Sequence, residues 1–189
     1  FENGSLKLIS QVLKEHGINK PLICTDPGLV KIGMTDKIRN LISNELSPTF
    51  YTETPANPTE QAVNDALEMY KQNDCDGVVG FGGGSSMDLA KTVALMANHE
   101  GNVVDYSVNE GGTGKIKETV PTIAIPTTSG TGSEVSLGAV IIMNDGRKLI
   151  LASDHLVPNG AICDPELTLG LPPVLSLIHI SEPTRLRRI

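Results

Sequence analysis

The stretch that most constrains the fold is residues 76–91, DGVVGFGGGSSMDLAK. An apolar run that is typical of a buried strand leads into three consecutive glycines, and a helical pattern begins directly after them. Glycines at a strand-to-helix turn tolerate unusual backbone conformations and let a ligand lie close to the main chain. The first turn of the helix offers unpaired N–H groups and the positive end of the helix dipole. The stretch predicts a turn that binds a pyrophosphate group; a tight turn without a ligand is the alternative.

Short apolar runs alternate with helical patterns along most of the chain. The runs that predict strands are residues 21–26, 49–53, 76–82, 122–126 and 160–164. The patterns that predict helices are residues 4–15, 30–46, 57–70 with Asn57 as the cap, and the residues from the glycine turn to about 98. This alternation predicts an α/β fold with a Rossmann-like, doubly wound, mostly parallel sheet. Residues 144–147 (NDGR) separate two further apolar runs and predict an added β-hairpin.

Polar or glycine-rich residues follow three of the predicted strands, at the point where each strand ends. These strand exits are Thr25–Asp26, Gly82–Ser86 and Thr127–Ser133. Because the carboxyl ends of parallel strands meet at one edge of a sheet, we expect the three exits to converge. Their convergence favours a bound cofactor over a bare turn.

The composition excludes several classes of function. A formal net charge of -7 argues against binding to a phosphate backbone, so we expect no nucleic-acid partner. No apolar run approaches the roughly 20 residues that span a bilayer, and no secretory signal is visible, so we expect no membrane association. The three cysteines form no CxxC pair and lie in or beside apolar runs, which favours reduced thiols and a cytoplasmic location. The four histidines lack metal-ligand spacing.

Two long motifs and a shorter one resemble the iron-containing (group III) alcohol dehydrogenase family. They are residues 82–91 (GGGSSMDLAK), 126–134 (PTTSGTGSE), and 164–167 (DPEL) continuing to 171–173 (LPP). The resemblance runs from about residue 4 to residue 175. It implies that residues 1–175 are the family's N-terminal dinucleotide-binding domain, and that the family's all-helical, metal-holding domain is absent from this chain.

The resemblance also implies which residues contact the cofactor. The ten residues are Asp26, Asn57, Gly83, Gly84, Ser85, Thr127, Thr128, Ser136, Lys148 and Leu167. Asp26 would meet the adenosine ribose hydroxyls, and its carboxylate would repel a 2′-phosphate, which favours NAD over NADP. Gly84 and Ser85 would hold the pyrophosphate. The alternatives are that Asp26 simply caps the following turn and that Lys148 is a solvated charge of the hairpin.

Two charged residues of the first long motif receive a structural interpretation. Asp88 lies near the start of the predicted helix, where a negative charge suits the helix dipole. Lys91 follows at i+3, a spacing at which opposite charges pair on a helix surface. We therefore expect an exposed ion pair without a role in cofactor binding.

The family pattern breaks after Leu175. In the family, a segment with a metal-binding aspartate and histidine follows, and further histidine ligands come from the helical domain. Here residues 176–189 follow, and three of the chain's five arginines lie in the last five residues. This shift in composition predicts a tail foreign to the family, and it resembles translated sequencing-adapter sequence. We expect no catalytic and no metal-binding residues in the chain.

The resemblance implies a truncated, metal-dependent alcohol dehydrogenase. The full-length parent would be an NAD-dependent, homo-oligomeric enzyme that transfers hydride between NAD(H) and a primary alcohol or aldehyde, with Fe(II) or zinc as its metal. The chain as given is expected to bind the cofactor only. The alternatives are another superfamily member, similar to glycerol dehydrogenase or dehydroquinate synthase, and a nucleotide-binding module without catalysis.

Overall fold

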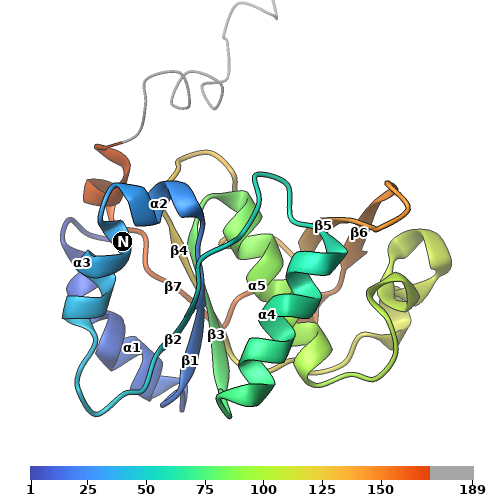
Figure 1. The fold of residues 1–189 in the computed structure, drawn as a ribbon, viewed down its shortest axis with the longest axis horizontal. Helices are drawn as coiled ribbons and strands as arrows, with labels where there is room; N and C mark the ends of the chain where they lie inside the picture. Colours follow the sequence, from blue (N-terminus) through green and yellow to red (C-terminus); the bar gives the residue numbers. More distant parts are fainter. Residues whose placement is uncertain (171–189) are drawn as a thin grey trace, which may run out of the picture.

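A five-stranded parallel sheet forms the centre of the protein. The computed structural model describes residues 1–170 (Figure 1). The sheet strands are β1 (Pro21–Cys24), β2 (Thr49–Tyr51), β3 (Gly77–Gly82), β4 (Thr122–Pro126) and β7 (Gly160–Ala161). They are ordered β2-β1-β3-β4-β7, and all four pairings are parallel. The predicted doubly wound sheet is confirmed, although β1, β2 and β7 are shorter than predicted.

Helices cover both faces of the sheet (Figure 1). The α-helices are α1 (Ile9–Glu15), α2 (Pro27–Lys31), α3 (Met34–Leu41), α4 (Glu60–Gln72) and α5 (Gly84–Ala97). Short 3-10 helices are η1 (Ser5–Leu8), η2 (Val103–Tyr106), η3 (Val108–Glu110), η4 (Gly112–Lys115), η5 (Asp154–Leu156) and η6 (Pro165–Thr168). Neighbouring residues of β3 point to opposite faces, because Val78 packs with the core under α4 and α5 while Val79 packs with the core under α1 and α3.

The predicted helix over residues 30–46 is wrong in extent and continuity. The structure has two short helices there, α2 and α3, which are separated by Gly33. Gly33 adopts a left-handed conformation with φ of 76°, which ends one helix and redirects the chain into the next. The apolar spacing across both helices mimics a single helix, so the break was invisible to periodicity.

The predicted cap of the third helix is also wrong. Thr59, not Asn57, is the N-cap of α4, because its side chain accepts a hydrogen bond from the N–H group of Ala62 at 3.2 Å. Glu60 is the first helical residue, and Pro58 precedes the cap rather than following it. Both Asn and Thr are good caps, so the sequence alone did not distinguish them.

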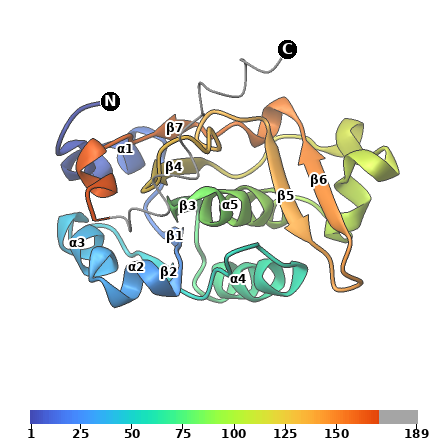
Figure 2. The same cartoon turned by 90° about the horizontal axis from the view of Figure 1, so that it is seen from above.

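The added hairpin is confirmed. Strands β5 (Gly138–Ile142) and β6 (Lys148–Ala152) pair antiparallel and form a separate two-stranded sheet beside α5 (Figure 2). Alternate residues of the hairpin, such as Ile141 and Leu151, are buried in the core that α4 and α5 share. The hairpin therefore extends one layer of the fold instead of joining the central sheet.

A buried carboxylate joins the start of the described chain to its end. Asp164 accepts hydrogen bonds from the N–H groups of Gly4 at 2.9 Å, Leu6 at 3.0 Å and Glu166 at 3.0 Å. The predicted domain boundary at residue 175 and the predicted foreign tail, residues 176–189, lie outside the described residues. None of the helices in the described part is long and apolar enough to cross a membrane.

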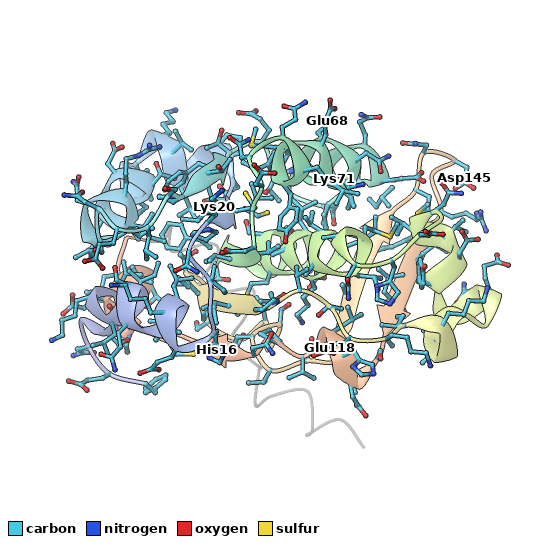
Figure 3. The ribbon with its side chains drawn as sticks, turned by 90° about the horizontal axis from the view of Figure 1, so that it is seen from below. His16, Lys20, Glu68, Lys71, Glu118 and Asp145 are labelled. Atoms are coloured by element: carbon cyan, nitrogen blue, oxygen red, sulfur yellow. The ribbon has the colours of Figure 1, made fainter. Side chains whose placement is uncertain are left out.

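The two ends of the strands differ in character. Figure 3 looks onto the face at the amino ends, where charged side chains such as Lys20, Lys71 and Glu118 project toward solvent. The carboxyl ends, on the opposite side, carry the candidate site.

Candidate functional site

A cleft of about 650 Å³ lies at the carboxyl ends of the strands. It opens between β1 and β3, which are neighbours in the sheet. From β1 the chain continues to β2 at one edge, and from β3 it continues to β4 and the other edge. This is the switch point at which doubly wound sheets bind their ligands. Five of the predicted residues line the cleft, namely Asp26, Gly83, Ser85, Thr127 and Thr128. The structure thus brings together residues from all three predicted strand exits.

Asp26 has two roles open to it. Its Oδ1 atom accepts a hydrogen bond from the N–H group of Leu29 at 3.1 Å and caps α2, as the capping alternative predicts. The side chain nevertheless lines the cleft, and its Oδ2 atom would lie 3.3 Å from a Cβ atom placed on Gly82. One carboxylate oxygen therefore holds a helix while the other faces the glycine turn.

The first residue of the glycine turn, Gly82, has no room for a side chain. Gly82 has φ of 152°, and a Cβ atom placed on it would lie 2.5 Å from Ser86 Oγ. Gly83 is the N-cap of α5 and has no side chain to satisfy the N–H groups of the first helical turn. These N–H groups and the positive end of a 14-residue helix therefore point toward the cleft and form a suitable site for an anion.

Ser85 contributes through its main chain more than through its hydroxyl proton. The Ser85 hydroxyl donates a hydrogen bond to the carbonyl oxygen of Ala56, which lies on the connection between β2 and α4. The hydroxyl oxygen can still accept a hydrogen bond, and the N–H group belongs to the first turn of α5. Ser85 thereby also fixes the wall of the cleft formed by residues 54–56.

Two buried threonine hydroxyls without hydrogen-bond partners in the described chain line the cleft. The Oγ1 atoms of Thr25, Thr54 and Thr128 are buried and make no hydrogen bond within the described part of the chain. Thr54 and Thr128 line the cleft, and Thr128 Oγ1 would lie 3.3 Å from a Cβ atom placed on Gly83. Buried polar atoms are rarely left unpartnered, so these hydroxyls indicate a ligand-binding wall.

Sequence reasoning missed Thr54. It lies three residues beyond the end of β2, and β2 is one of the parallel strands whose carboxyl ends share the cleft edge. A fourth strand exit was therefore visible in the sequence. The exit is short of glycine, which is why it did not stand out.

A second, smaller pocket of about 230 Å³ adjoins the cleft. Asn57, Gly84 and Lys148 line it, and Ser85 lines both spaces. Lys148 is exposed at the first position of β6 and brings a positive charge to this pocket. The predicted residues thus divide into two adjoining groups on either side of Ser85.

Two of the predicted residues lie outside both spaces. Leu167 is 3% exposed and packs in the core beneath α1 and α3. Ser136 lines neither the cleft nor the second pocket, and its hydroxyl accepts a hydrogen bond from Lys91. Cofactor contact by these two residues stays a prediction.

The expected surface ion pair of Asp88 and Lys91 is wrong. Lys91 is only 1% exposed, and its ammonium group donates three hydrogen bonds, two to Ser136 in the β4–β5 connection and one to Gly138 at the start of β5. Asp88 accepts from Ser133 Oγ at 2.7 Å and from the N–H group of Val140 at 3.0 Å. The i, i+3 spacing was correct, but the β4–β5 connection and the hairpin cover this helix face.

The family model for iron-containing alcohol dehydrogenases matches residues 1–165. The chain belongs to the iron-containing alcohol dehydrogenase family. A 4-hydroxybutyrate dehydrogenase of Cupriavidus necator is 48% identical over 170 residues, which cover 89% of this chain and 44% of that enzyme. Alcohol dehydrogenase 4 of Schizosaccharomyces pombe is 38% identical, with 93% of this chain and 42% of that enzyme covered.

Several solved structures share the fold of this chain. A sulfoacetaldehyde reductase of Bifidobacterium kashiwanohense in complex with NAD+ has a TM-score of 0.82 and 33% identity, covering 92% of this chain and 46% of that one. A 1,3-propanediol oxidoreductase has a TM-score of 0.88 and 28% identity, covering 95% of this chain and 47% of that one. The chain thus spans about half the length of the relatives it matches.

The described residues do not form the metal centre that the family's name implies. Among residues 1–170, no group of three or more His, Cys, Asp and Glu side chains is placed to hold a metal ion. Burial raises the pKa of the Cys24, Cys75 and Cys163 thiols above the ordinary value, which disfavours the reactive thiolate form.

Proposed function

We propose that residues 1–170 bind NAD(H) as the nucleotide-binding part of a metal-dependent alcohol dehydrogenase. One observation carries the proposal: Asp26, the start of α5 and the Thr127–Thr128 exit line a single cleft of about 650 Å³. That volume lies within the range of cofactor pockets, roughly 300–1,000 Å³. Family membership and the NAD+ complex of a relative support the same ligand.

The residues present fit a dinucleotide. Asp26 Oδ2 would accept hydrogen bonds from the adenosine ribose hydroxyls, and the N–H groups at the start of α5 would bind the pyrophosphate. The unpartnered hydroxyls of Thr54 and Thr128 would donate hydrogen bonds to oxygen atoms of the ligand. Lys148 and Asn57 would bind the part of the cofactor that extends past Ser85. When bound, the nicotinamide accepts or delivers a hydride.

We further propose that the longer protein interconverts a primary alcohol and an aldehyde. The similar enzymes carry names such as 4-hydroxybutyrate dehydrogenase and 1,3-propanediol oxidoreductase, and both of these compounds have primary alcohol groups. In the full-length enzyme the metal would favour the alkoxide, and residues 1–170 contain no group of side chains that could hold that metal. The 189-residue chain is expected to produce no NADH from alcohols, even with added Fe(II) or zinc.

The proposed setting is the cytoplasm, with a homo-oligomeric parent and neither nucleic acid nor membrane as a partner. The net charge of -7 and the buried, reduced Cys24 and Cys75 support this setting. Size-exclusion chromatography with light scattering on the full-length parent would measure the oligomeric state, and a monomer would contradict that part of the proposal.

Titration of the purified chain with NADH, followed by protein-dependent change in NADH fluorescence and by calorimetry, tests the central proposal. Saturable binding at one site per chain is expected, with NADPH about tenfold weaker because Asp26 repels its 2′-phosphate. No saturable binding of either cofactor would contradict the proposal.

A second candidate is a nucleotide-binding module without catalysis. It is favoured by one observation, namely that residues 1–170 contain no metal cluster. The native coding sequence downstream of Leu175 distinguishes the two: a continuing frame with histidine and aspartate ligands supports the enzyme, and a stop codon supports the module.

A further inference from the structure

Lys91 occupies an unusual place for a positive charge. It lies in the middle of α5 and is one of the largest fully buried side chains of the described chain, at 1% exposure. Its Nζ atom donates to Ser136 O at 2.8 Å, to Ser136 Oγ at 3.0 Å and to Gly138 O at 3.0 Å. All three protons of the ammonium group are thus used, and the acceptors lie at the end of the β4–β5 connection (Ser136) and at the first residue of β5 (Gly138).

Asp88 holds the same connection from one helical turn earlier. Its two carboxylate oxygens accept from Ser133 Oγ at 2.7 Å and from Val140 N at 3.0 Å. Together the two charges of α5 attach residues 133–140 at four positions. Figure 2 shows this connection running beside α5 before it enters β5.

Apolar burial contributes little to holding the middle of this connection. Val135 is 70% exposed and Leu137 is 48% exposed, so its largest apolar side chains face solvent. Hydrogen bonds to charged groups are roughly twice as strong as neutral ones, and here they replace the missing hydrophobic contacts. The position of residues 133–138 therefore depends on Lys91 and Asp88.

The same connection forms a wall of the cofactor cleft. It begins with Thr127 and Thr128, which line the cleft, and the Thr131 side chain would lie 3.7 Å from a Cβ atom placed on Gly84. A shift of residues 133–138 would move this wall relative to the start of α5. Lys91 itself lines neither the cleft nor the second pocket, so it acts on them only through this connection.

We propose that Lys91 is a positioning residue that anchors the β4–β5 connection and so preorganises the cofactor cleft; the proposal rests on the proposed function. Stability does not explain the buried charge, because burial lowers the pKa of Lys91 to about 8 although Asp88 and Glu134 oppose the shift. A lowered lysine pKa means that the folded state disfavours the positive charge relative to the unfolded state. The role of the charge is instead to hold residues 133–138 in place through the hydrogen bonds to Ser136 and Gly138.

The substitution Lys91→Met tests the proposal, because methionine fills a similar volume without the charge. We expect the NADH dissociation constant to rise about tenfold while the urea unfolding midpoint stays the same or increases, because the folded state disfavours the charge that the substitution removes. Hydrogen–deuterium exchange should become about tenfold faster at the backbone amides of residues 129–138. The matched control is Lys71→Met, at an exposed position of α4 (Figure 3). It should leave the NADH dissociation constant, the unfolding midpoint and the exchange rates unchanged.

Two results would overturn the proposal. One is unchanged exchange at residues 129–138 together with unchanged NADH affinity in folded Lys91→Met protein. The other is an unfolded variant, or a fall in the unfolding midpoint, because Lys91 would then serve the fold rather than the cleft. Exchange is measured without cofactor, so it tests the anchor even if the wild-type chain binds no NADH, a result that would contradict the proposed function instead.

Discussion

The carboxylate of Asp26 accepts a hydrogen bond from the N–H group of Leu29 at 3.1 Å, so the residue proposed to select the cofactor also caps α2. The two roles use different oxygens, since Oδ1 caps the helix and Oδ2 faces the glycine turn. Substitutions that keep a cap but remove the charge can therefore separate them.

Asp26→Ser is expected to change cofactor preference without a large loss of stability. Serine is a good N-cap and carries no charge, so the affinity for NADPH relative to that for NADH should be about tenfold higher in the variant than in the wild type. Parallel titrations with both cofactors measure the ratio. Asp26→Ala, which lacks the cap as well, should cost about 1 kcal/mol of unfolding free energy. An unchanged NADPH-to-NADH ratio in both variants would show that Asp26 serves only as a cap.

Thr128→Val is expected to stabilise the apo protein and weaken cofactor binding. The substitution removes a buried hydroxyl that has no partner in the described chain, which should add about 1 kcal/mol to the unfolding free energy. If the hydroxyl binds NADH, the dissociation constant should rise about fivefold. Urea unfolding and NADH titration measure the two effects.

Ser5→Ala provides the matched control for that substitution. The Ser5 hydroxyl is also buried and unpartnered within residues 1–170, but it lies in η1, outside the cleft lining. The control should stabilise the protein and leave NADH affinity unchanged. Equal NADH affinity in both variants would remove Thr128 from the proposed site.

Gly82→Ala is expected to destabilise the protein by about 2 kcal/mol. The residue has φ of 152°, and the new Cβ atom would lie 2.5 Å from Ser86 Oγ and 2.9 Å from Ser86 Cβ. Gly114→Ala is the control, because a Cβ atom there meets nothing within 4 Å. Thermal or urea unfolding of both variants measures the difference, and equal stabilities would contradict the tight packing of the turn.

Asp164→Asn is expected to cost about 2 kcal/mol at pH 7, because the charged acceptor of three N–H groups is lost. Burial alone would raise the pKa of Asp164, but the N–H groups of Leu6, Gly4 and Glu166 hold it below the ordinary value. A depressed carboxyl pKa stabilises the fold above the unfolded pKa of about 4 and ceases to do so as pH falls below it.

Urea unfolding at several pH values checks this expectation. The stability difference between wild type and Asp164→Asn should be full at pH 6 and shrink as the pH falls from about 4 toward 2. Asp154→Asn is the control, since Asp154 is exposed in η5 and its replacement should leave the stability at pH 7 unchanged. A difference that is constant across this pH range would contradict the role of the Asp164 charge.

The order of the elements and the location of the site followed from the sequence because both depend on local signals. Buried strands and amphipathic helices each have a period, and the rule for strand exits then brought Asp26, Ser85 and Thr127 to one cleft. Neither step requires knowledge of long-range packing.

The remaining features depend on distant parts of the chain. The ammonium group of Lys91 is buried because residues 136–138, some 45 positions away, supply its acceptors, and helical spacing carries no trace of them. The free hydroxyl of Thr54 was missed for a similar reason. Whether a threonine finds a partner is decided by the tertiary structure, not by its neighbours in sequence.

The bonds from Asp164 to Gly4 and Leu6 also set a temporal order for folding during synthesis. These contacts span about 160 residues, so the N–H groups of Gly4 and Leu6 cannot bond to Asp164 until it has left the ribosome, although the Leu6 side chain can already pack in the core. The pairing of β1 with β2 and β3 needs only the first 82 residues and can precede it. The hydrogen bonds from Gly4 and Leu6 to Asp164 are therefore among the last contacts of the domain to form.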